Sequence, residues 1–383
     1  MHRDLTQGDI SVHIRHLAIP ASIGFFFHTM FNVTDTYFAG MISTQALAAL
    51  TLSFPIFFMI IAIAGGMSEG VTALVGNALG EGNKAHAKHI INNVFFYALI
   101  LSLTLSLVGW LSAPFLMKQL GASGEYLEVS LAYINIVIAS VLFFVFTFFI
   151  NALLNAIGDT KAFRNALILG FIINIFLDYW FVKGGLGIEP MGVEGIALAT
   201  VLIELLTMLY LLFRLRSGSL LKNRPPFKLD SKVFKAFLAQ GTPPTLNLLL
   251  MSFGIYVITY FIAPFGQDAV AAYGVGMRIE QIALMPSIGL SVAVLSMVSQ
   301  NNGAKAYERI DIAMRVSRFY AFILAGLGMI ILLLFAKPMM LFFTPDEAVV
   351  EAGVLYVQIS AFALLGYILI FLYLALLQGI KRP

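Results

Sequence analysis

Residues 90–114 read IINNVFFYALILSLTLSLVGWLSAP and contain no Asp, Glu, Lys or Arg. An α-helix that crosses the hydrocarbon core of a bilayer needs about 20 consecutive, mostly apolar residues. The strands of a membrane β-barrel would instead show segments of about ten residues with alternating polarity. This continuous apolar run therefore predicts a transmembrane α-helix.

Nine further runs of this kind occur along the chain. With the first, the predicted spans are 16–38, 46–76, 90–114, 130–157, 162–183, 191–213, 234–263, 269–299, 316–343 and 349–380. Of the 383 residues, 60% are hydrophobic and 11% are charged, whereas soluble domains contain about 25% charged residues. We therefore predict an all-α polytopic membrane protein rather than a soluble enzyme or a nucleic-acid binder. Because the chain has no cysteine, disulfides, thiolate metal sites and a cysteine nucleophile are excluded.

Basic residues collect on one side of the predicted bundle. Nineteen of the 23 Lys and Arg residues lie near the two ends of the chain or in every second connection between helices. The opposite connections contain three, Lys118, Lys183 and Lys337, and Arg278 lies inside a predicted span. Because cytoplasmic loops carry an excess of Lys and Arg, we expect a multi-pass protein of the cell membrane (inner or plasma membrane) with a cytoplasmic N-terminus.

The chain contains an internal repeat, in which every match has the same offset as Pro20 and Pro243. The other matches include residues 36–38 with 259–261, Gly80 with Gly303, and residues 152–154 with 375–377. One copy holds six predicted helices, and an even number returns the chain to its starting side. The two copies should therefore be parallel and related by an axis along the membrane normal, as in some transporters.

The repeat predicts the domain boundaries. We expect an N-terminal six-helix lobe at 1–215, a basic cytoplasmic linker at 216–232 and a C-terminal lobe at 233–383. The second copy reaches Pro383, the counterpart of Thr160 in the first copy, and so accommodates only its first four helices. We therefore expect ten helices here and a longer natural protein with twelve, the last two helices of the second lobe being missing from this chain. A genuine ten-helix protein is the alternative.

A few polar residues lie inside the predicted spans, where they are costly and usually functional. Asp35 lies in the first predicted helix, and Asn174 and Asp178 lie one turn apart on one face of the fifth. At about 1.5 Å per residue, both acids lie roughly 5–8 Å below the outer ends of their helices, with Thr200 of the sixth slightly deeper. The second copy has Ile258 at the position of Asp35. The scaffold therefore needs no acid there, which favours Asp35 as a proton or cation site.

Asp35 and Asp178 are expected to share one polar cluster. Two carboxyl groups in a poorly solvated pocket cannot both ionise cheaply, so one of them should carry a proton near neutral pH. Alternatively, a Na⁺ ion could lie between them with Asn174 and backbone oxygens as hard ligands. The residue types suit both ions, and the two remain alternatives.

Further candidates lie elsewhere in the spans. Pro20 removes a backbone hydrogen bond from the first helix and permits a hinge there. In the second lobe Arg278, Glu280 and Gln281 are candidate polar residues of a cleft, with Arg278 expected to pair with Glu280 or with a first-lobe acid. The histidines show no spacing that predicts a metal site.

Several motifs resemble those of the MATE (multidrug and toxic compound extrusion) family of transporters, and the DinF-like branch in particular. The motifs are Pro20, DTYFAG at 35–40, LAAL at 47–50, LNAIGDTK at 154–161, NIFLD at 174–178 and MGVEGIALAT at 191–200. The resemblance implies two six-helix lobes in a V shape around a central cavity. It also implies that Asp35, Asn174 and Asp178 form the coupling site, that Thr200 contributes to it, and that the first helix bends at Pro20.

The resemblance implies a secondary active multidrug antiporter. It would export cationic or amphipathic compounds, such as drugs and dyes, in exchange for H⁺ or Na⁺ by alternating access. We expect a membrane transporter and not an enzyme, without a cofactor or a nucleic-acid partner, acting as a monomer in the bilayer. The alternative within the same superfamily is a lipid-linked oligosaccharide flippase, which would need a strongly cationic cavity. Away from the ends of the predicted spans only Arg278 is basic, which disfavours that alternative.

Overall fold

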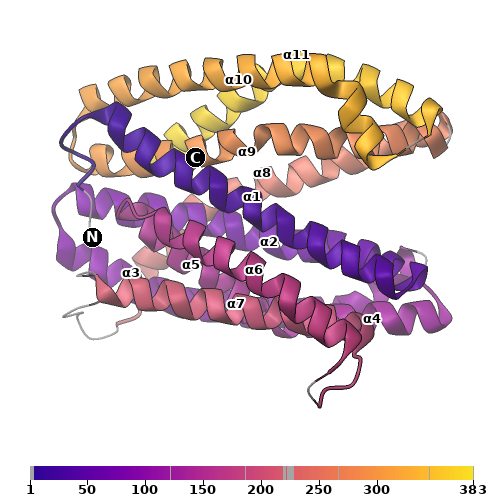
Figure 1. Cartoon of the computed structure of the whole chain (residues 1–383). Helices are drawn as coiled ribbons and strands as arrows, with labels where there is room; N and C mark the ends of the chain where they lie inside the picture. The colour runs from indigo at the N-terminus through magenta and orange to yellow at the C-terminus, as the bar shows by residue number, and fades with distance from the viewer. Residues whose placement is uncertain are drawn as a thin grey trace.

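The computed structural model describes residues 4–120, 122–185, 187–218, 221, 228–265, 267–344 and 346–382. All regular elements in this part of the chain are helical, and they run side by side along one direction (Figure 1). The helices are α1 (Ile10–Ile42), α2 (Thr44–Gly80), α3 (Lys84–Gln119), α4 (Gly124–Ala139), α5 (Val141–Ala156), α6 (Lys161–Lys183), α7 (Gly192–Ser217), α8 (Ser231–Ile262), the 3₁₀ turn η1 (Ala263–Phe265), α9 (Gln267–Gly303), α10 (Tyr307–Phe343) and α11 (Glu347–Gly379).

The predicted spans coincide with these helices, and the prediction of an all-α polytopic membrane protein is confirmed. Among the described residues, eight helices are separately long and apolar enough to cross a bilayer, and the pair α4–α5 can supply one more span. Helix α8, with 32 residues, covers the seventh predicted range.

The fourth predicted span, 130–157, is divided between two helices, because α4 and α5 meet at an angle of 43°. The bend lies at Ser140, whose backbone N–H and hydroxyl both donate to the carbonyl oxygen of Val137, at 3.0 and 2.6 Å. A serine that bonds back to its own turn competes with the regular helical hydrogen bond and bends a helix. The polar side chain therefore explains a break that contains no proline.

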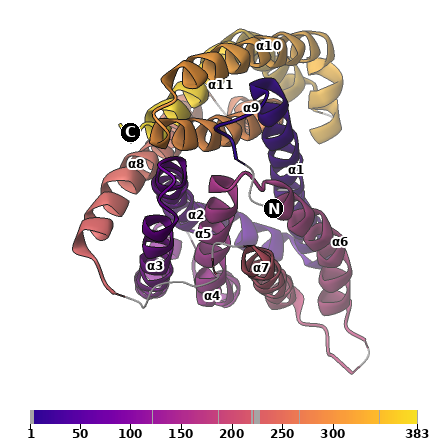
Figure 2. The same ribbon diagram turned by 90° about the vertical axis from the view of Figure 1, so that its left-hand side faces the viewer.

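The helices form two groups when the bundle is viewed from its end (Figure 2). We propose that α1–α7 and α8–α11 are the first and second lobes, with the predicted boundaries at 1–215 and 233–383. Within the predicted linker at 216–232, residues 219–220 and 222–227 lie outside the described residues. The remaining end of the linker is held against α3, since Asn93 donates to the carbonyl oxygen of Lys228 at 3.2 Å.

Asp230 completes this attachment. Its carboxylate lies 3.1 Å from the ring nitrogen of His89 on α3, and its backbone carbonyl accepts a hydrogen bond from the hydroxyl of Tyr97 at 3.0 Å. The N–H of Lys232 and the His89 side chain hold the pKa of Asp230 below its ordinary value. The start of α8, and with it the second lobe, is thus tied to the first lobe.

The two lobes meet closely at the end of the bundle where α2, α9 and α11 finish, and we call this contact the seam. The amide of Asn77 donates to the carbonyl oxygen of Gly379 at 2.9 Å, and that of Gln300 donates to the carbonyl oxygen of Ala156 at 2.6 Å. The repeat relates Asn77 to Gln300 and Ala156 to Gly379. The two hydrogen bonds across the seam are therefore copies of one another.

Glycines allow this approach. A Cβ added to Gly80 would meet the carbonyl oxygen of Gln300, and one added to Gly303 would meet that of Asn77. Nearer the middle of the bundle a second related pair repeats the arrangement, with Gly66 against Thr245 and Gly289 against Ser22. Because these neighbours are largely backbone atoms, they cannot move aside as a side chain would. The seam is packed to a distance that only glycine permits.

We predict that Gly80→Ala and Gly303→Ala each lower the stability of the protein by about 1–3 kcal/mol, the usual cost of overpacking a tight contact. Apparent melting temperatures of the purified protein in detergent measure the effect. Gly326→Ala on α10 is the control, because its Cβ would meet nothing within 4 Å and alanine favours a helix. Unchanged melting temperatures in both seam variants would contradict the packing described.

Candidate functional site

The first lobe buries a polar cluster around Asp35 of α1, whose side chain is 7% exposed. The amide of Asn174 on α6 donates to Asp35 Oδ1 at 3.2 Å, and the hydroxyl of Thr200 on α7 donates to Asp35 Oδ2 at 3.1 Å. Helices α1, α6 and α7 pack against one another, so residues from three distant parts of the sequence converge. The structure brings together three of the predicted site residues.

Asp178 completes the cluster and differs from Asp35 in its partners. It is fully buried, one turn after Asn174, and it lies beside Asp35. By distance and angle, neither carboxylate oxygen of Asp178 accepts a hydrogen bond from the described residues, and neither does Oδ1 of Asn174, although the side chains of Asn174 and Asp35 lie next to Asp178. Three buried oxygens without a protein donor, next to a second carboxylate, are a site where a proton or a hard cation can bind.

Tyr133 of α4 is a member of this cluster that sequence reasoning missed. It is buried, and its phenol lies within electrostatic range of both Asp35 and Asp178. A tyrosine in an apolar span carries no signal of its own. The internal repeat does carry a signal, because Tyr133 corresponds to Tyr356. The hydroxyl of Tyr356 lies 2.9 Å from the carboxylate of Glu280, an acid of the second lobe.

The second-lobe candidates do not form a joint site. Glu280 is buried and accepts its hydrogen bond from Tyr356 of α11, whereas Arg278 and Gln281 are exposed. Within the described residues Arg278 has no carboxylate at ion-pair distance. The predicted pairing of Arg278 with Glu280 or a first-lobe acid is therefore wrong. The two side chains lie two residues apart on α9, which places them on different faces of the helix.

The predicted hinge residue, Pro20, lies inside α1 and is buried. The helix is continuous from Ile10 to Ile42, so the proline is accommodated without ending it. Ser22, two residues after Pro20, packs against Gly289 of α9 in the second lobe. Pro20 therefore lies where α1 contacts the second lobe, and from there the helix continues towards Asp35.

Comparison with known proteins agrees with this architecture. The model of the MatE family matches residues 20–180 and 243–383. The chain belongs to this family. The two matched segments begin at Pro20 and Pro243, which the internal repeat relates to each other. As a member of the MATE family the protein is a multi-pass membrane transporter and not an enzyme.

Individual relatives cover nearly all of this chain. The probable multidrug resistance protein NorM of Thermotoga maritima is 27% identical over 92% of this chain and 76% of its own length. An FAD transporter of Shewanella oneidensis is 29% identical over 96% of this chain and 82% of its own length. A multidrug resistance MATE transporter solved in an outward-facing conformation superposes with a TM-score of 0.90 and 26% identity, covering 99% of this chain and 84% of that one.

We predict that Asp178→Asn stabilises the protein by about 1 kcal/mol. The amide removes a buried acid that has no protein donor and can itself donate to Asp35. The apparent melting temperature in detergent should rise by about 2 °C. Asp178→Ala is the matched comparison, because it removes the acid without supplying a donor and should not show the gain. A lower melting temperature for Asp178→Asn than for the unmodified protein would contradict the assignment.

Proposed function

We propose that this MATE transporter is a secondary active multidrug antiporter that exports cationic or amphipathic compounds in exchange for H⁺ or Na⁺. The observation that carries the proposal is the buried carboxyl pair Asp35 and Asp178 in the first lobe. At the position of Asp35 the second lobe has Ile258, which is exposed. The names of relatives such as the Thermotoga maritima protein support the substrate class, and the first-lobe acids support placement in the DinF-like branch.

The cluster binds the coupling ion in one of two ways. A proton on one carboxyl group removes the repulsion between Asp35 and Asp178 and supplies a donor to the other acid. A Na⁺ ion would instead take the carboxylates of both acids and Oδ1 of Asn174 as hard oxygen ligands. In both cases Thr200 holds Asp35 in place through its hydroxyl. The coupling ion is the only inorganic group that the proposal requires.

Helix α1 links this cluster to the contact between the lobes. It carries Asp35 in one half, and in the other half its Ser22 hydroxyl donates to the carbonyl oxygen of Pro286 on α9 at 3.2 Å. A change in charge at Asp35 acts on the same helix that packs across to the second lobe, and Pro20 supplies the place where that helix can bend. The ion can drive transport only through different affinities for the two states.

The basic end of the bundle, which includes the seam, faces the cytoplasm in this proposal. Closure of the seam then leaves the drug path open only towards the outside. The flippase alternative gains no support, because Arg278 is the basic residue of the sequence that lies well inside a predicted span, and one cation does not make a strongly cationic cavity. We further propose that a single chain performs transport, since both lobes contribute to one seam.

We predict that Glu189→Cys reacts with a membrane-impermeant maleimide in intact cells and that Ser217→Cys does not. Both side chains are exposed, Glu189 in the loop before α7 and Ser217 at the end of the same helix. The chain has no cysteine among its 383 residues and serves as the background. Permeabilised cells should allow both to react. If only Ser217→Cys were labelled in intact cells, the proposed orientation would be wrong and the basic end of the bundle would face outwards.

We predict that Asp35→Asn abolishes efflux of a cationic dye from vesicles driven by a pH or Na⁺ gradient. The amide cannot exchange a proton or balance a cation, so the gradient has nothing to act on. Glu280→Gln is the matched control, a buried acid of the second lobe that should retain most of the activity. Which gradient drives the unmodified protein identifies the coupling ion. Full dye efflux by Asp35→Asn under either gradient would refute the role of this acid.

A further inference from the structure

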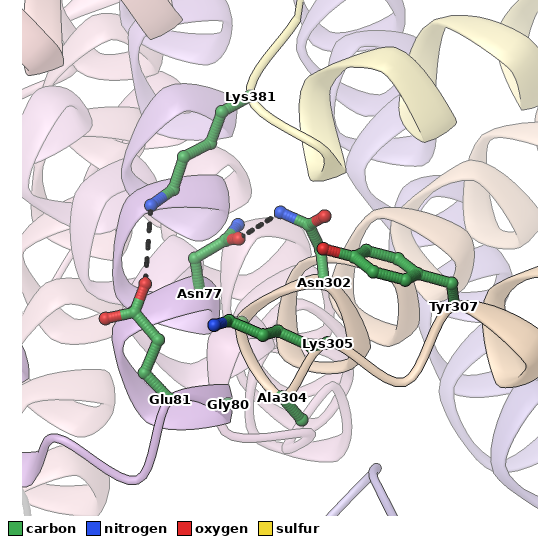
Figure 3. A pocket seen from close by; sticks show the side chains of 9 residues that line it. Asn77, Gly80, Glu81, Asn302, Ala304, Lys305, Tyr307 and Lys381 are labelled. Atoms are coloured by element: carbon green, nitrogen blue, oxygen red, sulfur yellow. Dashed lines mark hydrogen bonds and ion pairs between the residues drawn. The ribbon is translucent and has the colours of Figure 1, made fainter.

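A polar pocket opens at the seam, outside the site that carries the transport proposal. It has a volume of about 640 Å³ and lies between the end of α2 in the first lobe and the α9–α10 turn and end of α11 in the second. Figure 3 shows Lys381 turned towards Glu81, Asn302 joined to Asn77, and the side chains of Lys305 and Tyr307 beside them. The pocket therefore presents several hydrogen-bond donors to one space.

Both lysines have a backbone conformation that favours glycine. Lys305 has φ = 56° and Lys381 has φ = 60°, and among the described residues they are the non-glycine residues with positive φ. The first copy of the repeat has Gly82 (φ = 72°) and Gly158 (φ = 75°) at the corresponding positions. A left-handed conformation is unfavourable for lysine, and such strain collects at ligand-binding sites. The second copy thus has an unfavourable backbone conformation at two positions, and the lysines at both positions line one pocket.

The start of α10 shows a related difference between the copies. In the first copy Asn83 caps α3, its side chain accepting a hydrogen bond from the N–H of His86 at 3.0 Å. The corresponding residue of the second copy is Ala306, which gives α10 no side-chain cap. Tyr307, the first residue of α10, lines the pocket. The N-terminus of a helix carries partial positive charge and free N–H groups that suit an anion.

The charges in the pocket favour an anion as well. Glu81 is the acid among the lining residues, and its carboxylate lies 4.0 Å from Nζ of Lys381. None of the described ion pairs joins Lys305 to Glu81. The pocket therefore contains two lysines and one acid, and its lining has an excess of positive charge. Glu308 belongs to the first turn of α10 but does not line the pocket. The lining donors suit the several acceptor oxygens of a phosphate group.

We propose that this pocket binds a phosphate group and, by contacting both lobes, stabilises the closed seam. Phosphate oxygens would accept from Lys305 and Lys381, from the phenol of Tyr307 and from the second N–H of the Asn302 amide, whose first N–H donates to Asn77 Oδ1 at 2.6 Å. The group could belong to an anionic phospholipid of the adjoining leaflet or to a soluble phosphate compound. The site goes beyond the transport proposal, and only its assignment to the cytoplasmic side rests on the proposed orientation.

The test measures the apparent melting temperature of the full chain in lipid nanodiscs. One arm titrates inorganic phosphate into phosphatidylcholine discs, with chloride at equal ionic strength as the reference. The other arm compares phosphatidylcholine discs with discs that also contain phosphatidylglycerol. We expect a saturable rise in melting temperature in at least one arm. A rise with inorganic phosphate identifies a soluble phosphate, and a rise confined to phosphatidylglycerol identifies the lipid.

Lys305→Gly and Lys381→Gly are the decisive variants, because they restore the residue of the first copy and relieve the backbone, so the fold is retained. Each should weaken the apparent affinity at least tenfold, whereas Glu81→Gln should strengthen it. Lys183→Ala, at the far end of the bundle, should leave it unchanged. The proposal is overturned if the unmodified chain responds to neither arm beyond chloride, or if both glycine variants respond as it does.

Discussion

Two amide side chains, Asn77 and Gln300, hold the lobes together at the seam, and the rest of the structure depends on this contact. Each donates to a backbone carbonyl of the opposite lobe, and the repeat relates the two hydrogen bonds. Backbone carbonyls can come this close only because Gly80 and Gly303 lack side chains. This contact determines where α1 packs against the second lobe, where the polar pocket forms and which end of the bundle is closed.

The symmetric scaffold carries asymmetric chemistry. Asp35 has Ile258 as its counterpart, and Lys305 and Lys381 have glycines. The residues at the seam follow the repeat because a contact between two parallel lobes needs matching surfaces. The residues that bind ions need not match, since one site is enough to couple transport to a gradient. Departures from the repeat therefore mark the proposed functions, and conformity to it marks packing.

Much of the fold was predictable because a bilayer imposes a strong and local constraint on sequence. Spans of about 20 apolar residues can be read one at a time, and the constant offset of the repeat places the copies in register. The grouping of Asp35 with Asn174 and Thr200 was also predictable, since few polar side chains lie in the outer half of the first lobe. The bend at Ser140 was not, because serine is common in straight helices and its hydrogen bonding depends on local geometry.

Side-chain partners between helices were the least predictable part of the site. The position of Tyr133 beside the acids depends on how α4 packs against the neighbouring helices. The sequence around an isolated tyrosine does not reveal that packing. The pairing of Arg278 failed for a related reason, since charge complementarity in the sequence does not say which way a side chain on α9 points. In the sequence, the lysines of the pocket indicate only the cytoplasmic side. Their meeting across the seam depends on how the lobes pack.

In the proposed mechanism the ion at Asp35 and Asp178 controls whether the seam opens. Ala85 in the first lobe and Glu308 in the second are exposed and related by the repeat. Spin labels on Ala85→Cys and Glu308→Cys report the width of the seam by double electron–electron resonance. We expect a distance distribution that shifts with pH or Na⁺ in the otherwise unmodified chain and that no longer responds when Asp35→Asn is added. An identical response in the Asp35→Asn background would contradict control of the seam by this ion.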